Sequence, residues 1–261
     1  MPQSKKLNEA QVKALIRDEL DQELEDKHAI VSYQDKGLNA GIPSGLVFND
    51  QGNFYRLLAP IEQSQTGEAG RKYNTRIGNE INLKRLDISS YLSYTYPTIG
   101  ATSNLQNQKL AVRIMIVRAK NFGQYDKALD DMPTNLLLQT SSAAAGHVGS
   151  YDGEPLDSFS SINRDAFAVR YDKVHYLNAP TITFGATSTD TSSVPSKSVM
   201  WQHSIKFGKN GLKLKYANTT ATEPDFPYFM IIGYSSMSAG TIPSNGLVRM
   251  SMFSRATYQD A

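Results

Sequence analysis

Cysteine is absent from this sequence of 261 residues. Without it the chain has no disulfide framework, no thiolate metal site and no cysteine nucleophile. Histidine is scarce, and the four that occur (His28, His147, His175, His203) are far apart and match neither H-x-x-x-H nor H-E-x-x-H. We therefore expect no zinc site and no bound cofactor.

Long apolar runs are also missing. None approaches the roughly 18 to 20 residues that a membrane-spanning helix needs, so we expect no membrane span. Residues 1–6 lead into a charged segment and not into the apolar core of a signal peptide, which favours a protein made inside a cell. What is present, 14 tyrosines, 10 phenylalanines and 40% hydrophobic residues, indicates a globular domain that leans toward β-structure.

The first 30 residues read as a helical arm. Apolar residues recur there mostly three to five positions apart, which is typical of an amphipathic helix: Leu7, Val12, Leu15, Ile16, Leu20 and Leu24. We predict a helix from about Glu9 to about Lys27, and its apolar stripe needs a partner because a lone helix of this length is marginal. The arm holds five basic and seven acidic residues, a net charge of −2, so the remainder of the chain carries +4.

Residues 31–52 read as a linker, because Gly37, Gly41, Pro43 and Gly45 interrupt any period. The region 53–261 then shows eight β-type runs: Phe54 to Glu62, Glu80 to Tyr96, Lys109 to Lys120, Ala166 to Leu177, Met200 to Phe207, Leu212 to Tyr216, Tyr228 to Tyr234 and Leu247 to Tyr258. Gly208 to Gly211 predicts a tight hairpin between two of them. The stretches 121–165 and 181–198 are expected to be long loops.

Eight strands with uneven loops and no helix between them favour an all-β fold, an eight-stranded jelly-roll sandwich. The strands of a jelly roll are lettered B to I. Strands B, I, D and G form one sheet and C, H, E and F the other. Lettering the eight runs in chain order makes Phe54 to Glu62 strand B and Leu247 to Tyr258 strand I.

Several blocks resemble the capsid proteins of circular single-stranded DNA viruses that encode a replication-initiation protein, and those of related small icosahedral plant viruses. The first is R-x-G-x-x-I-x-L at Arg76 to Leu83, within the run from Gln63 to Ile88. Further blocks follow in the family's order: VRIMIVRAKN, VRYDKVHYL, KFGKNGLKLKY, PYFMIIGYSS and VRMSMFSRATYQDA. The resemblance covers nearly the whole body from about residue 53.

This resemblance implies a structural capsid protein of a virion, assembled inside the host cell from many copies into an icosahedral shell around nucleic acid. The family usually begins with an arginine-rich arm that neutralises the genome. Here the arm has a net charge of −2, which argues against packaging by the arm. It is compatible with a scaffold or coiled-coil role for the helix, with genome contact moved to the shell wall, or with packaging that works otherwise.

Four basic residues are candidates for that contact. In the lettering above, Arg113 lies on D, Lys213 and Lys215 on G, and Arg249 on I, all at polar positions of one sheet. A cluster of this kind attracts phosphate through counterion release without reading sequence. Solvated strand faces and ion pairs between subunits explain the same residues equally well.

Shell contacts bury on the order of 1,000 Å² each and use aromatic anchors. The candidates for these anchors are Tyr91, Tyr94, Tyr96, Trp201, Phe226 and Tyr228, some of which the core can claim instead. The acidic residues between 126 and 157 admit calcium between subunits, although a solvated loop is the simpler interpretation. No metal site is therefore predicted.

No enzyme is predicted. Ser235 lacks the second glycine of a nucleophile elbow, and Gly208 to Gly211 lacks the phosphate-binding pattern of a P-loop. The alternative function is a jelly-roll binding module, either lectin-like or trimeric and cytokine-like. A jelly-roll enzyme of the cupin class requires clustered histidine ligands, which the sequence does not supply.

Overall fold

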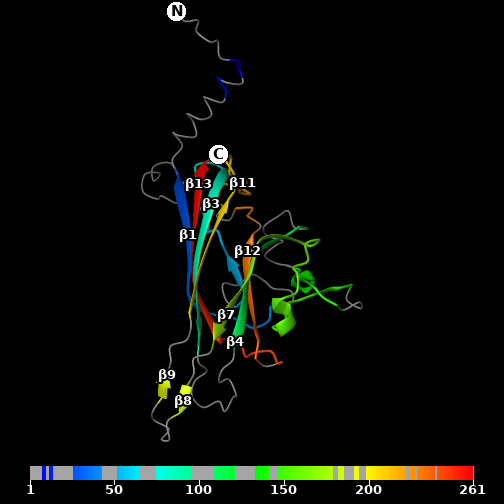
Figure 1. Ribbon diagram of the computed structural model, residues 1–261. Coiled ribbons are helices and arrows are strands. Elements are labelled where there is room, and N and C mark those ends of the chain that lie inside the picture. Colours follow the sequence, from blue (N-terminus) through cyan, green and yellow to red (C-terminus); the bar gives the residue numbers. More distant parts are fainter. Residues whose placement is uncertain are drawn as a thin grey trace, which may run out of the picture.

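The computed structural model is an all-β, antiparallel sandwich (Figure 1). It describes residues 8, 9, 12, 13, 26–42, 52–64, 75–95, 109–120, 133–141, 146–178, 182–184, 191–193, 198–221, 224–226, 228–238 and 240–260. Among these residues no helix has both the length and the apolar character needed to cross a membrane. Of the predicted arm helix, Glu9, Val12 and Lys13 are helical, and most of the remainder lies outside the described residues.

Sheet A has the strand order β1-β13-β3-β10, with β11 also paired to β3. Its strands are β1 (Lys27–Gly37), β3 (Glu80–Tyr94), β10 (Val199–Lys206), β11 (Leu212–Lys215) and β13 (Val248–Asp260). Apolar and polar residues alternate along these strands, so that one face is buried and the other is not. Strand β1 crosses the boundary between the predicted arm and the predicted linker, so a linker beginning at residue 31 is wrong for this stretch.

The predicted hairpin at Gly208 to Gly211 is wrong. Lys206 pairs with Arg85 and Leu212 with Leu83, so β10 and β11 run in the same direction along β3 as two pieces of one strand. The residues between them leave the ladder and return to it. Gly208 and Gly211 both have positive φ angles, and a side chain on Gly211 would meet the backbone oxygen of Leu83 at 2.8 Å. The glycines thus serve an excursion from the ladder and not a reversal of the chain.

Sheet B has the order β2-β12-β4-β7. Its strands are β2 (Phe54–Arg56), β4 (Lys109–Ala119), β7 (Phe167–Asn178) and β12 (Phe229–Ser236). Every residue of β12 is buried, and so are nearly all residues of β4. These two central strands are therefore covered on both faces.

The main core lies between the sheets. Leu86, Ile88 and Met250 of sheet A meet Ile114 and Ile232 of sheet B, and each is exposed by 1% or less. Each such side chain contributes about 1.5 to 3 kcal/mol relative to exposure. Trp201 of β10 closes one side against the ring of Tyr171, with ring centroids 4.9 Å apart.

A second core lies on the outer face of sheet B, where residues 133–163 form a covering segment (Figure 1). This segment contains η1 (Thr134–Leu136), β5 (Leu138–Gln139), β6 (Val148–Gly149) and η3 (Pro155–Ser158). The ring of Tyr151 lies directly over Gly233, where a Cβ atom would come within 2.5 Å of it. Burial raises the pKa of the Tyr151 hydroxyl to about 12, and that hydroxyl meets Ser158, whose own hydroxyl lies 2.6 Å from that of Ser235. Ser235 is fully buried and belongs to this contact.

All eight predicted strands are present with boundaries shifted by a few residues, although Phe54 to Glu62 shortens to β2. The predicted long loops contain further short pairs, β5 with β6, and β8 (Ile182–Phe184) with β9 (Thr191–Ser193). The predicted sheet partners are wrong: β13 pairs with β1 and β3, not with β2 and β4. The error follows from the missed strand β1, which occupies the place beside β13 that the prediction gave to Phe54 to Glu62.

Candidate functional site: the open face of sheet A

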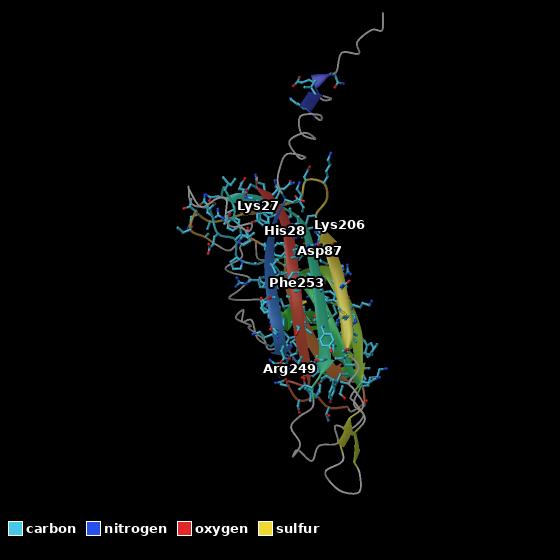
Figure 2. All side chains as sticks on the ribbon, turned by 90° about the vertical axis from the view of Figure 1, so that its left-hand side faces the viewer. Lys27, His28, Asp87, Lys206, Arg249 and Phe253 are labelled. Carbon is cyan, nitrogen blue, oxygen red and sulfur yellow. The ribbon has the colours of Figure 1, made fainter. Side chains whose placement is uncertain are left out.

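The outer face of sheet A, here called the open face, carries no covering segment within the part of the chain that is described. Figure 2 looks onto this face, with Lys206 on β10, Asp87 on β3, and Phe253 and Arg249 on β13, which are three adjacent strands. The five strands of sheet A hold nine basic and four acidic residues, a net charge of +5. A large exposed sheet face with this charge is the candidate site.

Strand register places the outward side chains in rows across the face. The first row is His28, Thr257, Arg85 and Lys206, and the second is Ile30, Arg255, Asp87 and Ser204. The third is Ser32, Phe253, Ser89 and Gln202, and the fourth includes Ser251, Tyr91 and Met200. Arg249 lies beyond these, beside Ser93. Cations therefore gather in the first two rows, at the end of the sheet where Lys27 begins β1 (Figure 2).

Asp87 is the centre of this basic end. Arg85 Nε donates to its carboxylate at 2.8 Å, Arg255 Nη2 at 3.4 Å and the Ser204 hydroxyl at 2.7 Å. Partial burial raises the pKa of Asp87, but the Ser204 hydrogen bond and the two arginines outweigh it, and the pKa lies below its ordinary value. One carboxylate thus faces two arginines, and the adjacent Lys206 adds a further exposed cation.

Three of the four predicted nucleic-acid residues lie on sheet A, and each has an acidic partner. Lys213 and Lys215 share Glu80, at 2.5 and 3.7 Å, and the hydrogen bond from Lys213 lowers the pKa of that carboxyl. Arg249 forms a two-pronged pair with Asp35, in which Nη2 lies 2.6 Å from Oδ2. Solvent screens exposed pairs of this kind, so they add little to stability. They leave both lysines accessible to a competing phosphate.

Arg113 does not join this group. It lies on β4 in sheet B, 3% exposed, where it contacts Asp172 and the covering segment. Its assignment to the same sheet as Lys213 and Arg249 is wrong. The reason is that β4 belongs to the other layer and is buried on both faces.

A diagonal of exposed apolar side chains crosses the middle of the open face. Ile30 (52% exposed), Phe253 (44%), Tyr91 (44%) and Met200 (75%) lie on four successive strands, β1, β13, β3 and β10. Scattered single apolar residues are normal on a surface, but an aligned set on one face marks an interaction site. We call these four residues the apolar diagonal.

Only Tyr91 of the predicted interface aromatics is exposed. Tyr94, Trp201, Phe226 and Tyr228 are each 6% exposed or less and belong to the main core, so their assignment to an interface is wrong. Their strands end near loops, but their side chains point inward. Tyr96 lies outside the described residues.

The acidic loop residues do not form a metal centre where they are described. Asp157 Oδ2 accepts hydrogen bonds from the backbone N–H groups of Asp152, Gly153 and Glu154, at 2.8 to 3.0 Å. Burial raises the pKa of Asp157, against these hydrogen bonds. Its carboxylate therefore shapes the covering segment. No group of three possible metal ligands occurs within the described residues, and Asp126, Asp130 and Asp131 lie outside them.

A scan against models of protein families finds no match, and a search of curated proteins finds none either.

The sequence analysis missed six residues of the site. They are Arg85, Arg255 and Lys206 in the basic end, and Ile30, Phe253 and Met200 in the apolar diagonal. The sequence feature that pointed to them is an apolar or basic residue at one of the outward-facing positions of a strand in which buried and exposed positions alternate.

Proposed function

We propose that this chain is the coat-protein subunit of a virion, a jelly roll whose copies assemble into a closed icosahedral shell around nucleic acid. The observation that carries the proposal is the strand order. With β1 taken as strand B, sheet A reads B-I-D-G, where β10 and β11 together are G, and sheet B reads C-H-E-F. All eight letters then follow chain order, as a jelly roll requires.

The open face supports the self-association in this proposal. It exposes four large apolar side chains along a diagonal of adjacent strands, and a shell subunit needs such surfaces because identical contacts must close around symmetry axes. Tyr94, Trp201, Phe226 and Tyr228 are buried inside the sandwich and have no such role. Of the predicted aromatics that the structure describes, Tyr91 alone keeps its interface role within the proposal.

The charge of sheet A supports contact with packaged nucleic acid. Lys206, Lys213 and Lys215 are exposed lysines on one side of the sheet, and Arg85 and Arg255 share a single carboxylate. Such a surface binds phosphates by displacing counterions, without base recognition. The shell wall thus supplies the positive charge that the arm does not.

The assembly prediction is tested on the full-length protein. Purified material examined by size-exclusion chromatography with light scattering, and by negative-stain electron microscopy, is expected to contain closed particles of megadalton mass. A stable trimer would favour the cytokine-like binding module instead. A monomer or dimer at all salt and protein concentrations would contradict the coat-protein proposal.

The nucleic-acid prediction uses charge reversal. Particles of the variant Lys213→Glu/Lys215→Glu should retain less nucleic acid, seen as a lower ratio of absorbance at 260 to that at 280 nm, because two phosphate contacts become repulsive. The slope of log affinity against log salt for single-stranded DNA should fall by about one per lost contact. The matched control is Lys109→Glu/Lys173→Glu, which reverses two exposed lysines of sheet B. Equal retention in both variants would reject the assignment to the open face.

A further inference from the structure

The apolar diagonal of the open face calls for a partner. Its four residues are among the ten large hydrophobic side chains exposed in the described part of the chain. Val12 of the arm, 40% exposed, is another of the ten. Four exposed apolar side chains of the body and one of the arm are thus uncovered in the described part of the chain.

The arm complements the open face in charge. Residues 18–26 read DELDQELED, with six acidic residues and no basic one. The basic end of the open face presents Arg85, Arg255 and Lys206. An acidic helix flank with an apolar stripe therefore fits a sheet face that offers an apolar diagonal beside cations.

The lengths also agree. A helix over about 17 residues, from Glu9 to Glu25, would be about 26 Å long at 1.5 Å per residue. The open face from the row of Arg85 to the row of Ser93 spans eight strand steps, about 26 Å at 3.3 Å per residue. A helix of this length would therefore match the open face from its basic end to Arg249.

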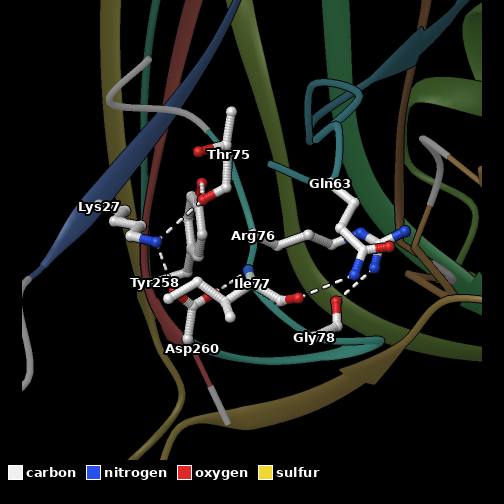
Figure 3. A network of polar contacts seen from close by, with 8 residues as sticks. All are labelled: Lys27, Gln63, Thr75, Arg76, Ile77, Gly78, Tyr258 and Asp260. Atoms are coloured by element: carbon white, nitrogen blue, oxygen red, sulfur yellow. Dashed lines mark hydrogen bonds and ion pairs between the residues drawn. The ribbon is translucent and has the colours of Figure 1, made fainter. Parts of the chain in front are cut away.

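The contacts at the start of β1 favour a face on another copy. The Asp26 carboxylate accepts a hydrogen bond from Gln259 Nε2 at 3.0 Å. Lys27 donates to the backbone oxygen of Thr75 at 3.1 Å and to the carboxylate of Asp260 (Figure 3). These contacts hold the chain beside β13 as far as Asp26, at the end of the sheet. In both Figure 1 and Figure 2 the blue helical pieces of the arm lie beyond that end.

We propose that the amino-terminal arm of one subunit docks on the open face of a second copy, with its apolar stripe on the apolar diagonal and its acidic run at the basic end. The inference rests on the proposed self-assembly and names one of its contacts. It also gives the acidic run a function, because a docked arm occupies cations that otherwise bind phosphate. Arm and nucleic acid then compete for the same end of sheet A.

The absence of cysteine allows a direct test on the full chain. Two separately tagged variants, Val12→Cys and Met200→Cys, are assembled together and oxidised mildly. The disulfide-linked heterodimer is expected to form about tenfold faster than with Ile242→Cys as the second chain, because a docked arm raises the effective concentration of the two thiols. Ile242 is an apt control because it is exposed (54%) but lies outside the strands of sheet A.

A charge variant sharpens the test. Arg85→Glu/Lys206→Glu in the Met200→Cys chain should reduce the cross-link several-fold, and high salt should reduce it as well. Equal rates for Met200→Cys and Ile242→Cys would overturn the inference, and so would a product dominated by Val12–Val12 dimers, since arms would then pair with one another. An internal cross-link within one double-variant chain would overturn the choice of a second copy. Particles without the cross-link refute only the arm contact, whereas absence of particles refutes the proposed function.

Discussion

Replacing Arg76 with methionine is expected to lower the free energy of unfolding by about 4 kcal/mol. The substitution would leave the buried oxygens that accept hydrogen bonds from the guanidinium without a donor. Arg76 is fully buried. Its guanidinium donates to Asn79 Oδ1 at 3.0 Å and to the backbone oxygens of Gly78, Asn218 and Ala221, the last at 2.8 Å. It also lies 4.0 Å from the centre of the Tyr216 ring. This one side chain joins the start of β3 to the loop after β11.

The acceptors of Arg76 are mostly backbone carbonyls, which cannot move away without distorting the chain. Burial lowers the pKa of the guanidinium, and the neighbouring Tyr216 and Asp260 act in the opposite direction. Figure 3 shows Arg76 beside the network of Lys27, Thr75 and Asp260, where the first and last strands of sheet A meet. Loss of Arg76 therefore loosens the end of the sandwich from which the arm leaves.

Urea unfolding followed by the fluorescence of Trp201 measures this effect, since Trp201 is the only tryptophan and is 5% exposed. Arg76→Lys should lose less, because it keeps the charge but reaches fewer acceptors. Ile77→Met is the control, because Ile77 is the next residue in the chain and its side chain is 68% exposed. A midpoint for Arg76→Met within error of that for Ile77→Met would show that the carbonyls find other donors.

The strands themselves were predictable because their signal is local. Alternation in β3, β10 and β13 follows one buried face, and all three lie where the sequence places them. β1 was missed because its residues include exposed Ile30 and a bulge at Asp35, where φ is positive, and because a helical pattern precedes it. The sheet order depends on pairing between distant strands, so one missed strand misplaced its neighbours.

The site was harder to predict because exposure depends on what covers each sheet. The apolar run FMIIGY in β12 indicates burial on both faces, and this signal was present in the sequence. It implies that the polar residues of the adjacent strand β4 are buried too. Arg113 is then expected to be an internal cation with an acidic partner, and not a surface cation. On sheet A the same alternation leaves Phe253 and Met200 exposed, because no segment among the described residues covers them.

Replacing Arg113 with methionine is expected to cost about 3 kcal/mol and to release the covering segment from sheet B. Its Nε and Nη2 each lie 2.7 Å from one carboxylate oxygen of Asp172 on β7. Its Nη1 donates to the backbone oxygens of Asp157 and Ser160, at 2.6 and 2.7 Å. The arginine therefore holds two strands of sheet B and the covering segment at one point.

A double-mutant cycle separates the parts of this effect. Asp172→Asn removes the ion pair but leaves the two carbonyl contacts, and Asp172 is partly exposed, so this variant alone should cost about 1 kcal/mol. The double variant Arg113→Met/Asp172→Asn should cost clearly less than the sum of the two single variants. In the double variant no Asp172 carboxylate is left without its cation. Limited proteolysis should cut between residues 133 and 163 faster in Arg113→Met than in Asp172→Asn, because only the former loses the bonds to Asp157 and Ser160. Equal cutting in both would mean that Tyr151 over Gly233 suffices to hold the covering segment, and that Arg113 acts within sheet B alone.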